Sequence, residues 1–176
     1  PLARTWDKPK RFHSNGVYPG HRFCLERLMY KNLLYNASMI VFKRSAVANV
    51  NSDYLKFKLC GDWMFWYQIC RQGIVIEIPL ILNKYRQHTN KVSTRAIQEG
   101  FNLSEALKCQ TMISKDFKLS KYKTLCLKGR MYKRLKKISP ERKLLLKKEF
   151  PYHMNGNLLH FFLYEIDKAF QISKMI

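Results

Sequence analysis

Residues 60–93 read CGDWMFWYQICRQGIVIEIPLILNKYRQHTNKVS, and the fold that the sequence predicts is organised around this stretch. Gly61 frees the backbone for a sharp turn, and Asp62 can cap a helix that begins at Trp63. Aromatic and aliphatic side chains supply the apolar positions of this helix, and Gly73 is its expected stop. The sequence therefore predicts a short helix with a carboxylate at its entrance.

Two apolar runs follow this helix. Residues 74–78 and 80–85 are rich in β-branched residues and leucine, which is typical of strands. Pro79 divides them, and proline suits an edge or a break between strands better than the interior of a sheet. Arg86 and His88 then lie just past a strand end, in a loop of the kind that commonly carries chemistry.

The order of these motifs resembles the carboxyl-terminal part of a family 2 glycosyltransferase of the GT-A type. Asp62 and its aromatic successors are followed about twenty residues later by Tyr85-Arg86-Gln87-His88. Upstream, residues 36–44 (NASMIVFKR) resemble the strand that precedes the acidic motif in these enzymes. The resemblance spans residues 36–93, about a third of the chain, and rests on order and spacing because no single motif is specific.

The resemblance implies an α/β fold, a partial GT-A (Rossmann-like) carboxyl-terminal portion with a few strands, followed by a basic helical extension. Residues 36–42 are expected to form the first strand. We expect residues 1–93 to be the acceptor-side part of a glycosyltransferase domain and residues 94–176 to be the helical extension. At 47% hydrophobic residues, the chain is long enough for one ordinary core.

The acidic motif departs from the usual family pattern. That pattern is Glu-Asp, an aromatic residue, two further residues and often Trp, with an Arg beyond it. This chain keeps Asp62, Trp63 and Trp66, but it has Gly61 where Glu is common and Gln68 where Arg is common. The candidate base is therefore in place, but the Glu and Arg of the family's accessory ion pair are both replaced. This departure points to a subgroup of the family.

The resemblance also assigns roles to individual residues. Asp62 is the candidate catalytic base, and serving as a helix cap is compatible with that role. Trp63, Trp66, Arg86 and His88 are the candidate substrate-binding residues, and a histidine in this loop holds the divalent metal or the donor diphosphate in some family members. The alternative structural roles are core packing for the two tryptophans and an ion pair with a buried carboxylate for Arg86. His88 would then be a packed or solvent-facing histidine that binds no ligand.

The donor site of the family uses an Asp-x-Asp pair to hold Mn or Mg against the nucleotide diphosphate. This chain has no such pair, its aspartates being at positions 7, 53, 62, 116 and 167. We therefore expect an acceptor-side fragment whose metal is bound mainly by a missing amino-terminal half. The implied function is inverting sugar transfer from a nucleotide-sugar donor to a glycan or lipid-linked acceptor, as in surface polysaccharide assembly of the cell envelope, with activity of this piece alone doubtful.

Charge and cysteine usage bound the partners and the compartment. Thirty-three Lys and Arg against 12 Asp and Glu give a formal net charge of +21, which implies an anionic partner or surface. The five cysteines form no CxxC pair or zinc spacing, so we expect reduced thiols in a cytoplasmic protein. No apolar run approaches the roughly 20 residues that span a bilayer.

The basic residues concentrate in residues 105–150, which hold 15 Lys and Arg against 4 Asp and Glu. One hypothesis is a peripheral membrane protein at the inner face of the plasma membrane, with this segment on anionic lipid. The alternatives are a solvated basic face and a nucleic-acid-binding module without catalysis, the latter disfavoured because no nucleic-acid motif is present. In the membrane hypothesis, an apolar stripe (Leu127, Met131, Leu135, Ile138) is bordered by Lys128, Arg130, Lys133, Arg134, Lys136 and Lys137.

Overall fold

The computed structural model describes residues 16–78, 80, 82, 101–136 and 138–170, and every structural statement below concerns these residues. The chain divides into two compact units, residues 1–113 and residues 114–176, and each is described by itself. The division that the sequence suggested, between residues 93 and 94, lies outside the described residues. The same is true of Arg86 and His88, and of the expected strand 80–85 except for residues 80 and 82.

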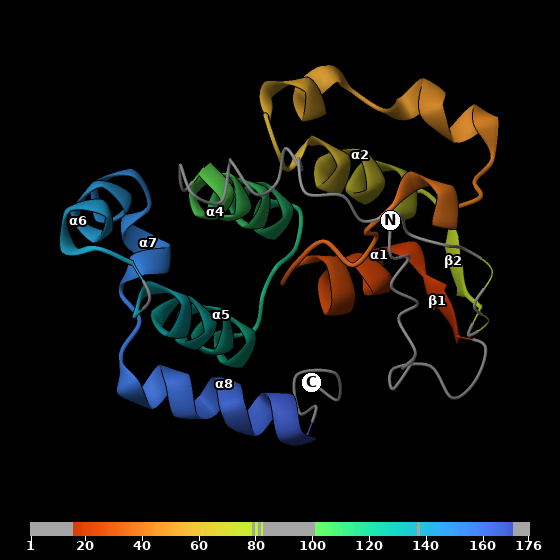
Figure 1. Ribbon diagram of the computed structural model, residues 1–176. Helices are drawn as coiled ribbons and strands as arrows, with labels where there is room; N and C mark the ends of the chain where they lie inside the picture. The colour runs from red at the N-terminus through yellow and green to blue at the C-terminus, as the bar shows by residue number, and fades with distance from the viewer. Residues whose placement is uncertain (1–15, 79, 81, 83–100, 137, 171–176) are drawn as a thin grey trace. The chain divides into compact units, whose positions relative to one another are not determined.

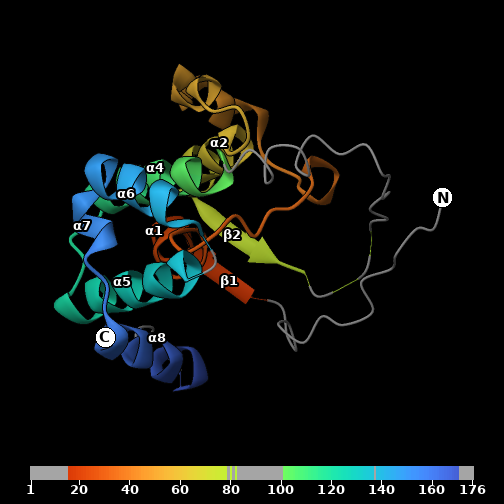
Figure 2. The ribbon, with the colours of Figure 1, turned by 60° about the vertical axis from the view of Figure 1, so that its left-hand side comes forward.

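The described chain is mostly helical, so the expected α/β fold is wrong. Its strands are β1 (Gly16–Pro19) and β2 (Ile74–Glu77), which pair antiparallel with Val17 opposite Ile76 (Figure 2). Across the described ranges there is no parallel, Rossmann-like sheet of the GT-A kind. Strand β2 confirms the run predicted from residue 74, but it finds one strand partner, far upstream in the sequence.

Residues 36–42 do not form the expected strand. A strand needs hydrogen-bonded neighbours to satisfy its backbone, and this run has none among the described residues. Instead, the side chain of Asn36 accepts a hydrogen bond from the backbone N–H of Ser38 at 3.1 Å and begins a 3-10 turn, Ala37–Met39. Two further 3-10 turns follow, Arg44–Asn49 and Ser52–Lys56.

The first unit is built from helices around the paired strands. Helix α1 (Gly20–Phe23) runs directly into a π-helical turn, Cys24–Leu28. Helix α2 (Gly61–Cys70) confirms the short helix predicted after Asp62, and helix α4 (Phe101–Lys115) lies in the part of the chain that was expected to be helical. Their buried side chains form the core of the unit, which includes Phe23, Leu28, Met29, Trp63, Trp66, Tyr67, Leu103, Leu107 and Cys109.

The second unit consists of α5 (Lys121–Leu135), α6 (Pro140–Glu149), α7 (Pro151–Met154) and α8 (Leu158–Phe170). Figure 1 shows α5 lying along α8, with α6 on the other side of α5. The helices approach closely at Gly129, where an added Cβ would overlap the backbone carbonyl of His160. The side chain of Ser120 caps α5 by accepting a hydrogen bond from the N–H of Lys123 at 3.2 Å.

The apolar stripe on α5 packs inside this unit. Leu127, Met131 and Leu135 are all buried, and Cys126 beside them donates to the carbonyl of Leu163 on α8 at 3.9 Å. The stripe is therefore not available to insert into a membrane, and the basic residues of α5 form the outer side of a packed helix. No helix of the described chain combines the length and the apolar character needed to cross a membrane.

Candidate functional site

Asp62 lies in the first turn of α2, at an accessible position of the first unit. Helix α2 begins at Gly61 and not at Trp63, so Asp62 is the second helical residue rather than its cap. Its Oδ1 accepts a hydrogen bond from the backbone N–H of Trp63 at 2.7 Å. Its Oδ2 accepts one from the side-chain amide of Asn32 at 3.1 Å. An ionised carboxylate offers about four acceptor positions, so both oxygens retain capacity for a further donor.

The protein raises the pKa of the Asp62 carboxyl group above its ordinary value. Desolvation is the largest cause, because the group is partly enclosed although the residue as a whole is exposed. The hydrogen bonds from Trp63 and Asn32 stabilise the charged form and act in the opposite direction. A carboxylate that is reachable from solvent and more basic than usual is suited to accept a proton.

Asn32 fixes the position of this carboxylate. Its side-chain oxygen accepts a hydrogen bond from the backbone N–H of Leu34 at 3.0 Å, which leaves its nitrogen to face Asp62. The amide orientation is thereby set by a partner on each side. Asn32 follows the π-helical turn of the first unit, thirty residues before Asp62, and no local sequence pattern predicts this pairing.

Glu105 on α4 binds the loop that leads into α2. Its Oε1 accepts from the backbone N–H of Lys58 at 2.8 Å, and its Oε2 accepts from those of Leu59 and Cys60 at 2.8 and 2.9 Å. The Glu105 side chain is buried, so a single carboxylate satisfies three successive backbone donors. It holds the chain immediately before the helix that carries Asp62, and sequence analysis did not identify it.

Trp63 and Trp66 are both buried, as the more cautious of the two sequence interpretations held. The indole Nε1 of Trp63 donates to the backbone carbonyl of Leu28 at 2.9 Å and joins α2 to the π-helical turn. Trp66 packs edge-on against Phe42 and Phe65, with ring centroids 5.6 and 4.9 Å away. Neither indole offers an open face for a sugar ring in this arrangement, and both support the helix from behind.

Two cysteine thiols of the first unit have raised pKa values. Cys109 on α4 donates to the backbone carbonyl of Cys60 at 3.9 Å, and a side-chain hydrogen bond with Cys60 together with burial raises its pKa. Burial also raises the pKa of Cys70 to about 12. Thiols of this kind are poor nucleophiles, so they serve as packing groups.

The residues present do not make a metal site by themselves. Within the described part of the chain, no three His, Cys, Asp or Glu side chains are grouped so that they could hold an ion. His88, the residue that the sequence suggested as a metal ligand, lies outside that part, as does Arg86.

The raised pKa of Asp62 predicts how the free energy of unfolding should change with pH. The native state binds the Asp62 proton more tightly than the unfolded chain does, so this residue stabilises the native state below its ordinary pKa of 3.8. That contribution should disappear as the pH rises through the native pKa. We expect the unfolding free energy of the wild type, minus that of Asp62→Asn, to fall as the pH rises from the ordinary value of 3.8 through the higher native pKa of Asp62.

Urea unfolding of both proteins across this range measures the difference, and a carbon NMR titration of the Asp62 carboxyl group checks the direction independently. A difference that rises with pH would show that the hydrogen bonds to Asp62 outweigh its desolvation.

Comparison of the chain with models of known protein families, with curated proteins and with solved structures gives no significant match.

Proposed function

We propose that this chain supplies the acceptor-side part of an inverting sugar transferase, in which Asp62 is the general base. The donor is a nucleotide sugar, and the acceptor is a hydroxyl group of a glycan or of a lipid-linked saccharide. The proposal rests on the environment of the Asp62 carboxylate: the residue is exposed, Asn32 orients the carboxylate, and its pKa is higher than usual. The order of Asp62, its aromatic successors and residues 85–88 in the sequence supports the choice of sugar transfer among reactions that use such a base. The strand expected upstream, at residues 36–42, does not contribute to this support.

The proposed step is a displacement at the anomeric carbon. The acceptor oxygen forms a bond to that carbon while its proton passes to a free lone pair of Asp62. The bond between the anomeric carbon and the diphosphate oxygen breaks, and the nucleoside diphosphate leaves with the electron pair. Because the acceptor attacks opposite the leaving group, the configuration at the anomeric carbon inverts.

The surroundings of Asp62 support such a step. Asn32 and the backbone of Trp63 hold the carboxylate in one orientation, and Glu105 holds the preceding loop, so little reorganisation is needed when the acceptor arrives. The buried side chains of Trp63 and Trp66 make the helix beneath the carboxylate rigid. These residues act on the base by positioning it rather than by contacting the sugar.

The proposal is tested with the protein encoded by the complete reading frame. It is incubated with a panel of labelled nucleotide sugars and with saccharide or lipid-linked acceptors extracted from the source cells. We expect release of nucleoside diphosphate that depends on the acceptor, and a product whose anomeric configuration, measured by proton NMR coupling, is opposite to that of the donor. Retention of configuration, or no acceptor-dependent release by a folded protein with any donor, would refute the proposal.

A further inference from the structure

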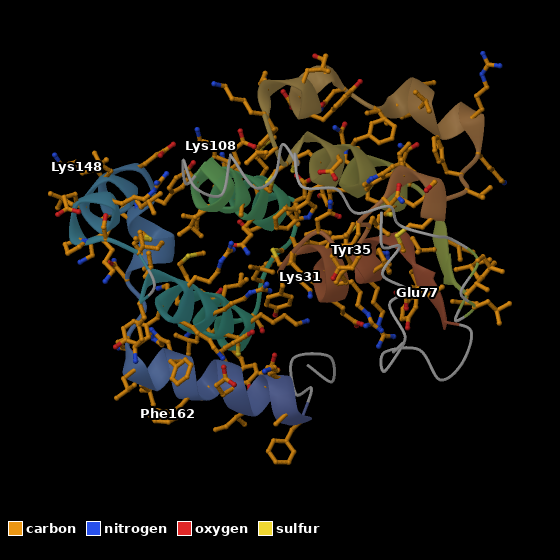
Figure 3. The ribbon with its side chains drawn as sticks, in the orientation of Figure 1. Lys31, Tyr35, Glu77, Lys108, Lys148 and Phe162 are labelled. Carbon is orange, nitrogen blue, oxygen red and sulfur yellow. The ribbon has the colours of Figure 1, made fainter. Side chains whose placement is uncertain are left out.

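Helix α8 carries its large apolar side chains on the side that faces away from the second unit. Leu159, Phe162, Ile166 and Phe170 follow one another at helical spacing and are 65%, 53%, 45% and 71% exposed. Leu158, at 50%, borders the same row. We call these five residues the outer face of α8. Figure 3 shows Phe162 on the side of α8 away from α5.

The opposite side of α8, which packs on α5, is more polar than its outer face. Asp167 is buried there, and His160, Phe161, Leu163 and Tyr164 are half-buried. The close approach at Gly129, the bond from Cys126 to the Leu163 carbonyl, and the contact between the Tyr132 and Phe161 rings, whose centroids are 6.5 Å apart, join the two helices. A helix that packs in a water-soluble unit ordinarily turns its apolar side inward. Although Phe161 and Leu163 are half-buried, α8 leaves five large apolar side chains exposed in a contiguous row, and such a row marks an interaction surface.

Basic side chains border the outer face along one edge. The Nζ of Lys133 lies 2.6 Å from Glu165 and 5.6 Å from the centre of the Phe161 ring, and the Nζ of Lys136 lies 5.7 Å from that centre. The Phe161 ring is in turn 5.7 Å from that of Phe162. Lys168, on the same helix and exposed, adds a third cation, so three ammonium groups and one carboxylate lie beside the apolar row.

The charge of the whole unit decides between possible occupants of this face. Residues 114–176 contain 16 Lys and Arg against five Asp and Glu. A second copy of the chain would bring the same positive charge against it, which opposes association. An anionic bilayer surface instead offers an apolar boundary for the leucine and phenylalanine side chains and negative headgroups for the lysines around them.

We propose that α8 lies in the surface plane of an anionic lipid bilayer, with its outer face at the boundary of the acyl chains and Lys133, Lys136 and Lys168 at headgroup level. The helix attaches the unit peripherally and does not cross the bilayer. The surface that binds is thus not the one the sequence suggested, because the apolar stripe of α5 is buried and α8 provides the exposed apolar row. This inference does not depend on the proposed sugar transfer.

The experiment measures co-sedimentation of the 176-residue chain with vesicles of phosphatidylcholine alone or mixed with phosphatidylglycerol, at low and at high salt. We expect binding to the mixed vesicles that weakens with salt, and little binding to the neutral ones. Replacing Phe162→Gln and Ile166→Gln together should lower the partition coefficient at least tenfold, because two apolar side chains no longer leave water. Both residues are exposed, so the fold should be retained, which circular dichroism checks.

The chain offers matched controls on α6, in the same unit. Leu144 and Leu145 are 59% and 66% exposed, so Leu144→Gln with Leu145→Gln removes similar apolar surface away from α8 and should leave binding within about twofold. For charge, Lys136→Gln with Lys168→Gln is expected to weaken binding severalfold more than Lys147→Gln with Lys148→Gln, although both pairs lower the net charge equally.

Several results would overturn the proposal. Equal loss of binding in the double variant of α8 (Phe162→Gln, Ile166→Gln) and in that of α6 (Leu144→Gln, Leu145→Gln) would mean that α8 is not the contact surface. Equal binding to neutral vesicles would remove the role of the anionic headgroups. A dimer seen by light scattering and lost in the Phe162→Gln, Ile166→Gln variant would assign the outer face to a second copy. Tighter binding to short duplex DNA than to the mixed vesicles would assign the basic surface to nucleic acid.

Discussion

Asp62→Asn is expected to lower the turnover of the protein encoded by the complete reading frame by about two to four orders of magnitude, the range typical for loss of a general base. The amide cannot accept the acceptor proton, although it fills nearly the same volume. Affinity for the nucleotide sugar should change little, because the proposed role of Asp62 is toward the acceptor hydroxyl. The measurement is the steady-state rate of nucleoside diphosphate release at saturating donor and acceptor.

Asp53→Asn is the matched control for this variant. Asp53 is in the same unit and pairs with Lys56 at 2.5 Å, but it does not contact Asp62, Asn32 or Glu105. Its replacement removes the same charge and should change turnover by less than about twofold. Near-normal turnover in Asp62→Asn would return Asp62 to a structural role in the first turn of α2, and equal losses in both variants would point to a general effect of charge on donor binding.

The helices of this chain could be predicted from local sequence because their signals are local. Ser139 and Pro140 mark the start of α6, and the apolar periodicity in residues 105–113 and 127–135 identifies parts of α4 and α5 that the structure buries. Each of these signals operates within about one helical turn. They identify an element without stating what it packs against.

The strands show the limit of that approach. Both residues 74–77 (IVIE) and residues 36–42 (NASMIVF) contain β-branched residues and were expected to form strands, yet only the first run pairs, with Gly16–Pro19. Pairing depends on a partner strand that composition does not reveal, and the resemblance supplied a sheet that the described residues do not form. Even the observed sheet leaves Ile74, Ile76 and Val17 exposed, and the helix that packs on its strands is α1.

Of the candidate site, Asp62 could be predicted from the sequence, but the residues that hold it in position could not. Asp62 could be found because a carboxylate next to aromatic residues at a helix start is a recognisable pattern. Asn32 contacts Asp62 from thirty residues away in the sequence. Glu105 binds the loop before α2 from more than forty residues away, because α4 packs in the same unit. In the sequence, Glu105 looks like the acidic residue of a helix start, which says nothing of the loop it holds.

Helix α8 gives a second example of a property that periodicity leaves open. The sequence predicts a helix from Leu158 that is apolar nearly all round, docked in a core or against a partner. The structure confirms the helix and its packing on α5, but places Asp167 toward the interior and Phe162 toward solvent. Which side faces inward was settled by the backbone approach at Gly129, a contact between segments thirty-one residues apart.

Glu105→Gln is expected to lower the free energy of unfolding of the first unit by about 1–3 kcal/mol. The amide keeps one oxygen, so it can serve either Lys58 or the pair Leu59 and Cys60, while its NH₂ group faces a backbone donor. Glu105→Leu removes all three acceptor contacts and should cost more than Glu105→Gln. Urea unfolding followed by tryptophan fluorescence is the measurement, because Trp63 and Trp66 lie in the core of this unit.

A local measurement separates the role of Glu105 in the loop from a general loss of stability. Hydrogen exchange of the three amides that donate to Glu105 should accelerate in Glu105→Gln by more than the change in global stability accounts for, because these bonds are broken in the native state itself. Glu149→Gln, which neutralises an exposed carboxylate on α6, should change neither exchange at the loop nor the unfolding of the first unit. If the loop amides remain as protected in Glu105→Gln as in the wild type, the three bonds do not hold the approach to Asp62, and the orientation of the base would then rest on Asn32 and the first turn of α2.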